Sequence, residues 1–205
     1  MGYGKIAACA VLALVALGCA TTMSESEQRA KALEVMKASF KPRGSATLDR
    51  LNQDETQSLC SEYMNQVPKD VAKKIETTNL QSVKYPTDGR YLGDWKEGEK
   101  IAQSGRGLQF NDPVGGVNGA NCYACHQLAP QELSYGSIGP SLYRYGKQRG
   151  NSDEVVKYTW AKVYNAEAYA ACSTMPRFGH NKILTEDQIR HVVALLLDPD
   201  SPVNK

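Results

Sequence analysis

The sequence lacks an excess of charge of either sign. Its 24 basic and 22 acidic residues give a formal net charge of +2 over 205 residues. Nucleic-acid-binding domains usually carry a clustered basic excess, so the balance excludes nucleic acid as an expected partner. Apolar residues make up 41% of the chain and charged residues 22%, which are globular values and exclude a disordered or collagen-like chain.

Cysteine is also scarce, and β-structure has no clear signal. Six cysteines are too few for a disulfide scaffold in a chain of this length, so their positions matter more than their number. We find no alternating stretch long enough for a useful strand and no internal repeat. The sequence therefore predicts an all-α fold.

The first 20 residues have the pattern of a signal peptide. Lys5 precedes an apolar run over 6–17 that is too short to span a bilayer comfortably, and small residues follow. Export to the periplasm is expected. Two kinds of signal-peptide cleavage fit the sequence. Residues 16–19 resemble a lipobox, in which Cys19 would carry a lipid anchor, while the small residues also suit cleavage by an ordinary signal peptidase.

Helical periodicity and capping residues organise the remainder of the chain. They predict helices over 24–40, 47–66, from Pro68 onward, 95–104, 152–171 and from Thr185 to Asp198. Residues 81–94 contain Pro86 and Asp88-Gly89 and are expected to form a linker. We therefore divide the mature chain into a helical N-terminal extension, 21–92, and a second domain, 93–205.

The second domain contains the motif Cys122-Tyr123-Ala124-Cys125-His126. Two thiols at this spacing can each form a thioether with a haem vinyl group, and the next histidine is then delivered to the iron. A closed zinc site requires four ligands, and only three candidate ligands are clustered here. A redox C-x-x-C pair should open a helix after a strand, whereas this motif follows a Gly- and Asn-rich loop. The motif predicts one covalently bound haem c held by Cys122 and Cys125, with His126 as an axial ligand.

The motif supplies only one axial ligand, so a second must come from elsewhere. Candidates are Met175, His180, His191 and Met64. We favour Met175, which lies in an expected loop and is followed by Pro176, because histidine–methionine ligation is a usual high-potential arrangement for electron transfer. His180 shares that loop and is the main rival. His191 lies among valines of the last helix, where a core histidine is the commoner explanation.

Two further features surround the motif. An axial histidine normally donates its other ring N–H to a carbonyl, and the rigid Gly139-Pro140 turn is expected to supply that carbonyl to His126, the alternative being an ordinary turn. Cys60 and Cys172 remain as a pair that an oxidising compartment favours as a disulfide, with two buried thiols as the alternative. Closing that loop would stabilise the fold by roughly 4 kcal/mol.

Basic side chains near the haem motif and the Met175 loop could form a rim that steers an acidic partner or an anionic substrate, with a solvated loop face as the alternative. They are Arg144, Lys147, Arg149, Arg177 and Lys182.

These segments resemble a class I cytochrome c, and more specifically the SoxX family of sulfur-oxidation cytochromes. The resemblance covers about residues 93–203 and is carried by 121–127, 138–142, 172–180 and 195–199. Its most specific element is Met175-Pro176-Arg177-Phe178-Gly179. Residues 24–92 have no counterpart in the minimal family domain and could be a docking surface, a helical cap or a spacer.

The resemblance implies the electron-transfer haem subunit of a SoxAX-type complex, an L-cysteine S-thiosulfotransferase. Its partners would be a SoxA-type haem subunit, the SoxYZ carrier and a small cytochrome c that accepts electrons. The complex oxidatively couples thiosulfate to a cysteine of SoxYZ, with the bond-forming site on the SoxA side, so no catalytic residue is expected here. A free-standing periplasmic electron carrier and a haem sensor with a displaceable Met175 are the alternatives.

Overall fold

The fold is helical. The structure, a computed structural model, describes residues 23–205, so the signal peptide expected over 1–20, and Cys19 with it, lies outside the described residues. No strand occurs in residues 23–205, where the only β-contact is an isolated bridge between Arg43 and Ala46. The expected all-α class is confirmed. Over the same residues, no helix is both long and apolar enough to cross a membrane.

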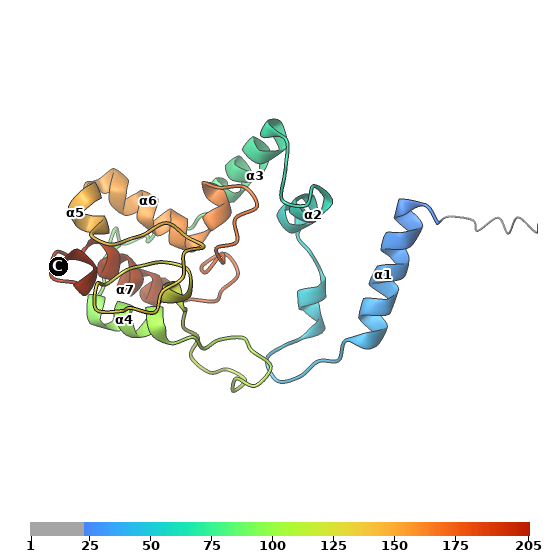
Figure 1. The fold of residues 1–205 in the computed structure, drawn as a ribbon, viewed down its shortest axis with the longest axis horizontal. Coiled ribbons are helices and arrows are strands. Elements are labelled where there is room, and N and C mark those ends of the chain that lie inside the picture. The colour runs from blue at the N-terminus through green and yellow to red at the C-terminus, as the bar shows by residue number, and fades with distance from the viewer. Residues whose placement is uncertain (1–22) are drawn as a thin grey trace, which may run out of the picture. The chain divides into compact units, whose positions relative to one another are not determined.

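The helices follow one another along the chain with short 3-10 turns between them (Figure 1). The α-helices are α1 Glu25–Ser39, α2 Glu55–Glu62, α3 Lys69–Gln81, α4 Trp95–Gln103, α5 Tyr145–Arg149, α6 Asp153–Tyr164 and α7 Glu186–Leu197. The 3-10 turns are η1 Leu48–Leu51, η2 Cys122–Ala124, η3 Ala166–Ala168 and η4 Pro202–Asn204.

The chain divides into two compact units, with the boundary after Phe40. In the first unit, α1 begins with a capping box in which the Ser24 side chain accepts from the Glu27 N–H and the Glu27 carboxylate accepts from the Ser24 N–H. The second unit, Lys41–Lys205, holds every other helix and both segments that the sequence assigns to haem binding.

The helix expected over 47–66 is wrong at both ends, since α2 covers only Glu55–Glu62. A 3-10 turn at Leu48–Leu51 ends before α2 begins, because Asp54 rather than Thr47 is the capping residue. The Asp54 carboxylate accepts from the Gln57 N–H at 2.9 Å, and the Gln57 side chain accepts from the Asp54 N–H at 3.0 Å. This reciprocal pair starts a new helix at Glu55.

The helix expected over 152–171 is too long, and α5 was not expected. The helix α6 ends at Tyr164 because Asn165 adopts extended backbone geometry and its side chain caps the next 3-10 turn, accepting from the Glu167 N–H at 3.2 Å. The five residues of α5 are too few for periodicity to reveal.

The core of the second unit lies where α4 crosses α7. An added Cβ at Gly98 would lie 2.1 Å from the His191 carbonyl oxygen, so the two helix backbones are in close contact there. The His191 Nδ1 accepts from the Asp94 N–H at 2.8 Å, which ties α7 to the start of α4. His191 is therefore the partly buried structural histidine that the sequence favoured.

The expected linker over 81–94 packs against the rest of the second unit. Val83 is buried, and the indole N–H of Trp160 donates to the Lys84 carbonyl at 2.9 Å. Tyr91 meets the Trp160 ring edge-on at a centroid distance of 5.7 Å. Through Lys84 and Tyr91 the segment contacts Trp160 of α6, and residues 41–92 and 93–205 form one compact unit.

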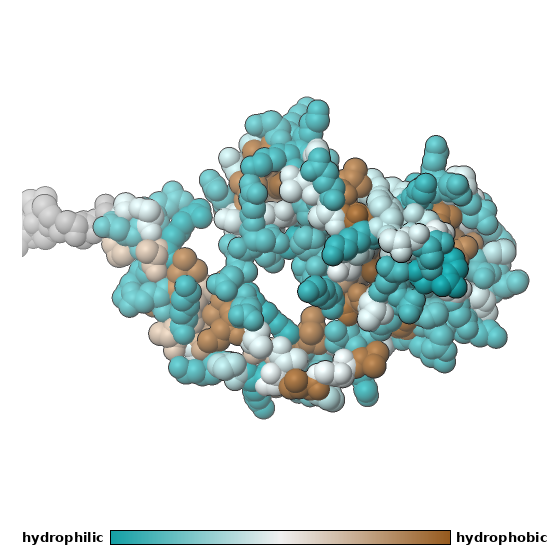
Figure 2. All heavy atoms as spheres, turned by 180° about the vertical axis from the view of Figure 1, so that it is seen from behind, coloured by the Kyte–Doolittle hydropathy of each residue, from teal (hydrophilic) through white to brown (hydrophobic). Residues whose placement is uncertain are grey.

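Apolar side chains also remain exposed in loops of the second unit. Figure 2 shows a mainly hydrophilic face on which apolar residues form small separate groups. The most exposed of the apolar loop residues are Met64, Val114, Val117, Leu133 and Ile138.

Candidate haem site

An apolar cavity in the second unit brings together Cys122, His126 and Met175. These residues come from the C-x-x-C-H motif and from a loop 49 residues further along the chain, the difference between positions 126 and 175. The other walls are entirely apolar: Ala120, Leu128, Leu142, Val163, Phe178, Leu184, Val192 and Leu196. The cavity thus brings one motif thiol together with an imidazole and a methionine thioether, and the last two are the pair of groups that ligate the iron in cytochromes c.

The 3-10 turn η2 presents the motif to this cavity. The Asn121 side chain accepts from the Ala124 N–H at 3.2 Å and thereby caps the turn. The N–H groups of Cys125 and His126 both donate to the Cys122 carbonyl, at 3.1 and 2.9 Å. This tight turn lets Cys122 and His126 line the same cavity, whereas Cys125 is half-buried beside it and does not line it.

Neither motif cysteine takes part in a disulfide. Burial, and then the neighbouring Cys125, raise the pKa of the Cys122 thiol to about 12, so it stays protonated at neutral pH. A redox or zinc cysteine instead works as a thiolate with a lowered pKa. Within residues 23–205, no group of three or more His, Cys, Asp or Glu side chains is arranged to hold a metal ion.

His126 is oriented by Pro140, as expected. Its Nδ1 lies 2.7 Å from the Pro140 carbonyl oxygen. Because a carbonyl can only accept, Nδ1 carries the proton and Nε2 keeps a free lone pair, which is the tautomer needed for binding a metal through Nε2. The Gly139 N–H in turn donates to the Cys125 carbonyl at 2.9 Å, which fixes the turn against the motif.

Gly139 lies directly against the His126 ring, and we predict that alanine there displaces it. An added Cβ would lie 2.2 Å from Cε1 and 2.5 Å from Nδ1 of His126, too close for any side chain. A displaced ring would lose its hydrogen bond to the Pro140 carbonyl, and loss of such a partner of a ligating histidine typically costs about 10- to 100-fold in metal affinity. The Gly139→Ala variant should therefore show a weakened histidine–iron signal in the electron paramagnetic resonance and visible spectra.

Gly115→Asn is the matched control for this substitution. Nothing lies within 4 Å of an added Cβ at Gly115, and asparagine tolerates its positive φ. Its spectrum should match that of the unmodified protein. Identical spectra for Gly139→Ala and Gly115→Asn would contradict the role of the close contact.

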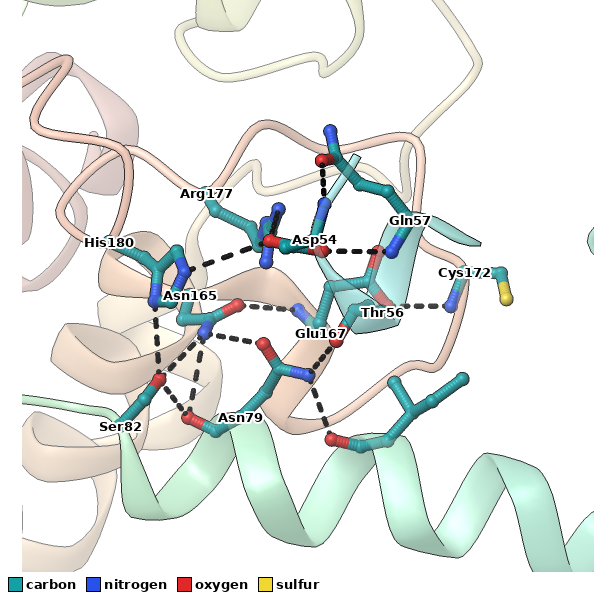
Figure 3. A network of polar contacts seen from close by, with 11 residues as sticks. Asp54, Thr56, Gln57, Asn79, Ser82, Asn165, Glu167, Cys172, Arg177 and His180 are labelled. Atoms are coloured by element: carbon teal, nitrogen blue, oxygen red, sulfur yellow. Dashed lines mark hydrogen bonds and ion pairs between the residues drawn. The ribbon is translucent and has the colours of Figure 1, made fainter. Parts of the chain in front are cut away.

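Met175 is the one sequence candidate for the second axial ligand that lines the cavity. It lies in the loop between η3 and α7, and its N–H donates to the Ser173 hydroxyl at 3.2 Å. Met64 is exposed outside the cavity, and His191 is bonded to the start of α4. His180 points elsewhere: its Nδ1 lies 3.3 Å from the Ser82 hydroxyl and its Nε2 lies 4.0 Å from an Asp54 oxygen (Figure 3).

A polar network joins the Met175 loop to α2 and α3, and sequence reasoning missed most of it. Figure 3 shows Asp54 reaching both Arg177 and Gln57, with Asn79 and Asn165 below. The expected Cys60–Cys172 disulfide is confirmed, with the two Cα atoms 5.4 Å apart.

Arg177 does not belong to an exposed basic rim. Only 7% of its side chain is exposed, and its Nη2 lies 2.6 Å from Asp54 Oδ2. No pattern in the sequence indicates this contact, because Asp54 and Arg177 are 123 residues apart. Arg144, Lys147 and Arg149 are exposed, as a rim would require.

His180 makes the stability of this network pH-dependent. Burial and the nearby Arg177 charge lower the pKa of His180 below 6.5, and Asp54 opposes them only partly. Between this lowered pKa and pH 6.5, the unfolded chain binds more protons than the folded chain. The stability that depends on neutral His180 is therefore fully present above pH 6.5 and is lost as the pH falls through this window. Denaturant unfolding from about pH 5 to 8 should show this loss.

The His180→Gln variant is the control for this pH dependence, because glutamine can hydrogen-bond but does not titrate. Its free energy of unfolding should change less with pH than that of the unmodified protein. Equal slopes in the two proteins would show that another group is responsible.

Comparison with known proteins places this chain beside a bacterial lipoprotein. No protein-family model matches the sequence. A protein from Aquifex aeolicus that is described as an uncharacterized lipoprotein is 40% identical over 156 residues, which cover 75% of this chain and 73% of the relative.

Proposed function

We propose, for a chain that belongs to the same family as the uncharacterized lipoprotein of Aquifex aeolicus, that its second unit contains a class I cytochrome c domain with one covalently bound haem c. The observation that carries this proposal is the apolar cavity lined by Cys122, His126 and Met175. Cys122 and Cys125 would hold the haem, and His126 and Met175 would ligate its iron. When bound, the haem supplies reversible one-electron chemistry.

The protein's own residues would tune that chemistry. Pro140 holds the proton on Nδ1 of His126 and so keeps Nε2 available as a ligand. The apolar walls, including Leu128, Phe178 and Val192, exclude water from the cavity. A dry site disfavours the extra positive charge of ferric iron, so these walls and the thioether ligand both favour a high reduction potential.

Within this class, we propose the role of the electron-transfer haem subunit in a SoxAX-type complex. The support is the resemblance of 138–142 and 172–180 to the SoxX family. The SoxA-type subunit would couple thiosulfate to a cysteine of SoxYZ, and this chain would pass the electrons to a small cytochrome c. This chain should accordingly contain residues that bind haem, but no site that joins thiosulfate to the SoxYZ cysteine.

Co-expression with the SoxA-type haem subunit of the same organism tests this role. The account predicts a heterodimer on size-exclusion chromatography that carries haem on both polypeptides. A haem-bearing monomer that never associates with a second haem subunit would contradict the SoxX role and favour the free-standing carrier.

We further propose that Cys19 carries a lipid that holds the protein at the periplasmic membrane surface. The relative's description as a lipoprotein and the lipobox-like residues 16–19 support this. Mass spectrometry of the mature N-terminus should find an acylated Cys19. An unmodified N-terminus at Thr21 would rule out the anchor.

A further inference from the structure

We infer that residues of the N-terminal extension hold Met175 in its ligating position, through the Asp54–Arg177 ion pair and the Cys60–Cys172 disulfide. This inference rests on the proposed haem function. We call residues 172–177 the axial loop and these two bonds the clamp. Asp54, Cys60, Cys172 and Arg177 are positioning residues, since none of them is proposed to touch the iron.

The two bonds of the clamp flank the ligand closely. Cys172 lies three residues before Met175, and Arg177 lies two residues after it. Their partners are both on α2: Asp54 is its N-cap, and Cys60 lies in its second turn. The axial loop is thus attached to one short helix at both ends, and the thioether is presented from the segment between the two attachments.

The ion pair fixes the loop relative to the start of α2. Asp54 uses Oδ2 to bind Arg177 Nη2 at 2.6 Å and Oδ1 to accept from the Gln57 N–H at 2.9 Å. One carboxylate therefore caps the helix and holds the guanidinium at once (Figure 3). The Arg177 side chain is only 7% exposed, so this pair is shielded from solvent on the arginine side and is weakened by salt less than a surface pair.

The segments around the axial loop are attached to α3 as well. The Ala171 N–H donates to the Glu76 carboxylate at 3.3 Å, and the Asn165 amide donates to Asn79 Oδ1 at 2.9 Å. On the far side of the loop, His180 lies 3.3 Å from the Ser82 hydroxyl. These contacts fix the residues just before and just after the axial loop, while the clamp fixes the loop itself.

Holding the loop matters because a methionine thioether is a neutral, replaceable ligand. If the loop moved, Met175 would no longer be held where it could ligate a bound haem, and an external ligand could take its place. The apparent affinity for such a ligand is proportional to the fraction of molecules in which Met175 has dissociated. Carbon monoxide binding to ferrous haem therefore measures how well the clamp works, and the methionine–iron charge-transfer band gives an independent spectroscopic readout.

The Asp54→Asn substitution tests the ion pair in the exported holoprotein. Asparagine caps a helix as well as aspartate does, so α2 keeps its cap while Arg177 loses its opposite charge. We expect a weaker charge-transfer band and an apparent carbon monoxide affinity that rises roughly tenfold. Opening the disulfide with a mild reductant, which also brings the haem to the ferrous state, should likewise raise the carbon monoxide affinity of the unmodified protein.

Glu55→Gln is the matched control. Glu55 is the next residue in α2 and forms an exposed ion pair with Lys74 at 2.7 Å, away from the axial loop. Its loss should leave the charge-transfer band and carbon monoxide affinity unchanged. If Asp54→Asn does not fold, the disulfide reduction in the unmodified holoprotein decides.

The outcomes separate the clamp from the haem assignment. Haem that stays with the polypeptide in a denaturing gel supports the cytochrome domain whatever the clamp does. If haem is attached but Asp54→Asn behaves like Glu55→Gln, or disulfide reduction changes nothing, the clamp is wrong and the proposed function stands. If no haem attaches to the unmodified protein, both proposals fail.

Discussion

Replacing Cys122 and Cys125 together by serine should abolish covalent haem attachment. A thioether needs sulfur, and serine offers a similar size without it. Cys122 lines the apolar cavity and Cys125 lies half-buried beside it, so both are placed to hold one group. Haem-dependent peroxidase staining after denaturing electrophoresis should detect the unmodified protein and lose all signal for the double variant. Each single variant should retain part of the signal through its remaining thioether.

The Cys60→Ser, Cys172→Ser double variant is the matched control, because it also removes two cysteines from the same unit. It loses the disulfide but keeps the C-x-x-C-H motif, so its haem should remain covalently attached. Its unfolding free energy should fall by roughly 4 kcal/mol, as expected for opening a large loop. Covalent haem staining that survives in the Cys122, Cys125 double variant would contradict the assignment of the motif.

Replacing Met175 by leucine should open one axial position of the iron. Leucine has a similar volume, and such exchanges usually cost less than about 1.5 kcal/mol, so the fold should persist. The methionine–iron charge-transfer band should disappear, and ferrous protein should bind carbon monoxide readily. Because axial ligands set haem potentials over a range of roughly 0.8 V, we expect the reduction potential to fall on the order of 0.1 V or more.

His180→Gln separates the two candidates in this loop. His180 contacts Ser82 and lies outside the cavity, so its loss should leave the charge-transfer band in place. A spectrum that changes with His180→Gln and not with Met175→Leu would make His180 the ligand. Redox titration of both variants alongside the unmodified protein provides the potentials.

The turn at Cys122–Ala124 and the contact between His126 and Pro140 could be predicted from sequence because they are local. Cys122 through His126 form one short turn, and the Pro140 carbonyl follows 14 residues later, in contact with His126 at 2.7 Å. Helix α7 was equally clear, since Thr185 and Gln188 form its capping box and its apolar face is regular. Each of these predictions needs only neighbouring residues and known chemistry.

The structural role of the extension could not be read in the same way. Asp54 has the sequence signature of a helix cap, and nothing nearby indicates that it also binds Arg177. Asn79 and Asn165 are buried polar residues that hydrogen-bond to each other across 86 positions of the chain. Long-range pairs of this kind follow from the packing of α3 against η3, which neither periodicity nor turn chemistry determines.

The expected domain boundary at residue 92 shows a related limit. Pro86 and Gly89 correctly suggest turns, but turns also occur inside compact units. Val83 is nevertheless buried, and the Lys84 carbonyl accepts from the indole N–H of Trp160, 76 positions further along the chain. Turn residues do not indicate such long-range contacts.

The intact mass of the exported, unmodified protein, recorded under denaturing conditions together with its visible spectrum, tests the central claim most directly. Expression should be in a bacterium that attaches haem in its periplasm. We predict a mass that exceeds the mature polypeptide by one haem and a spectrum of low-spin c-type haem. A polypeptide mass without haem, with Cys122 and Cys125 recovered as free thiols, would contradict the assignment.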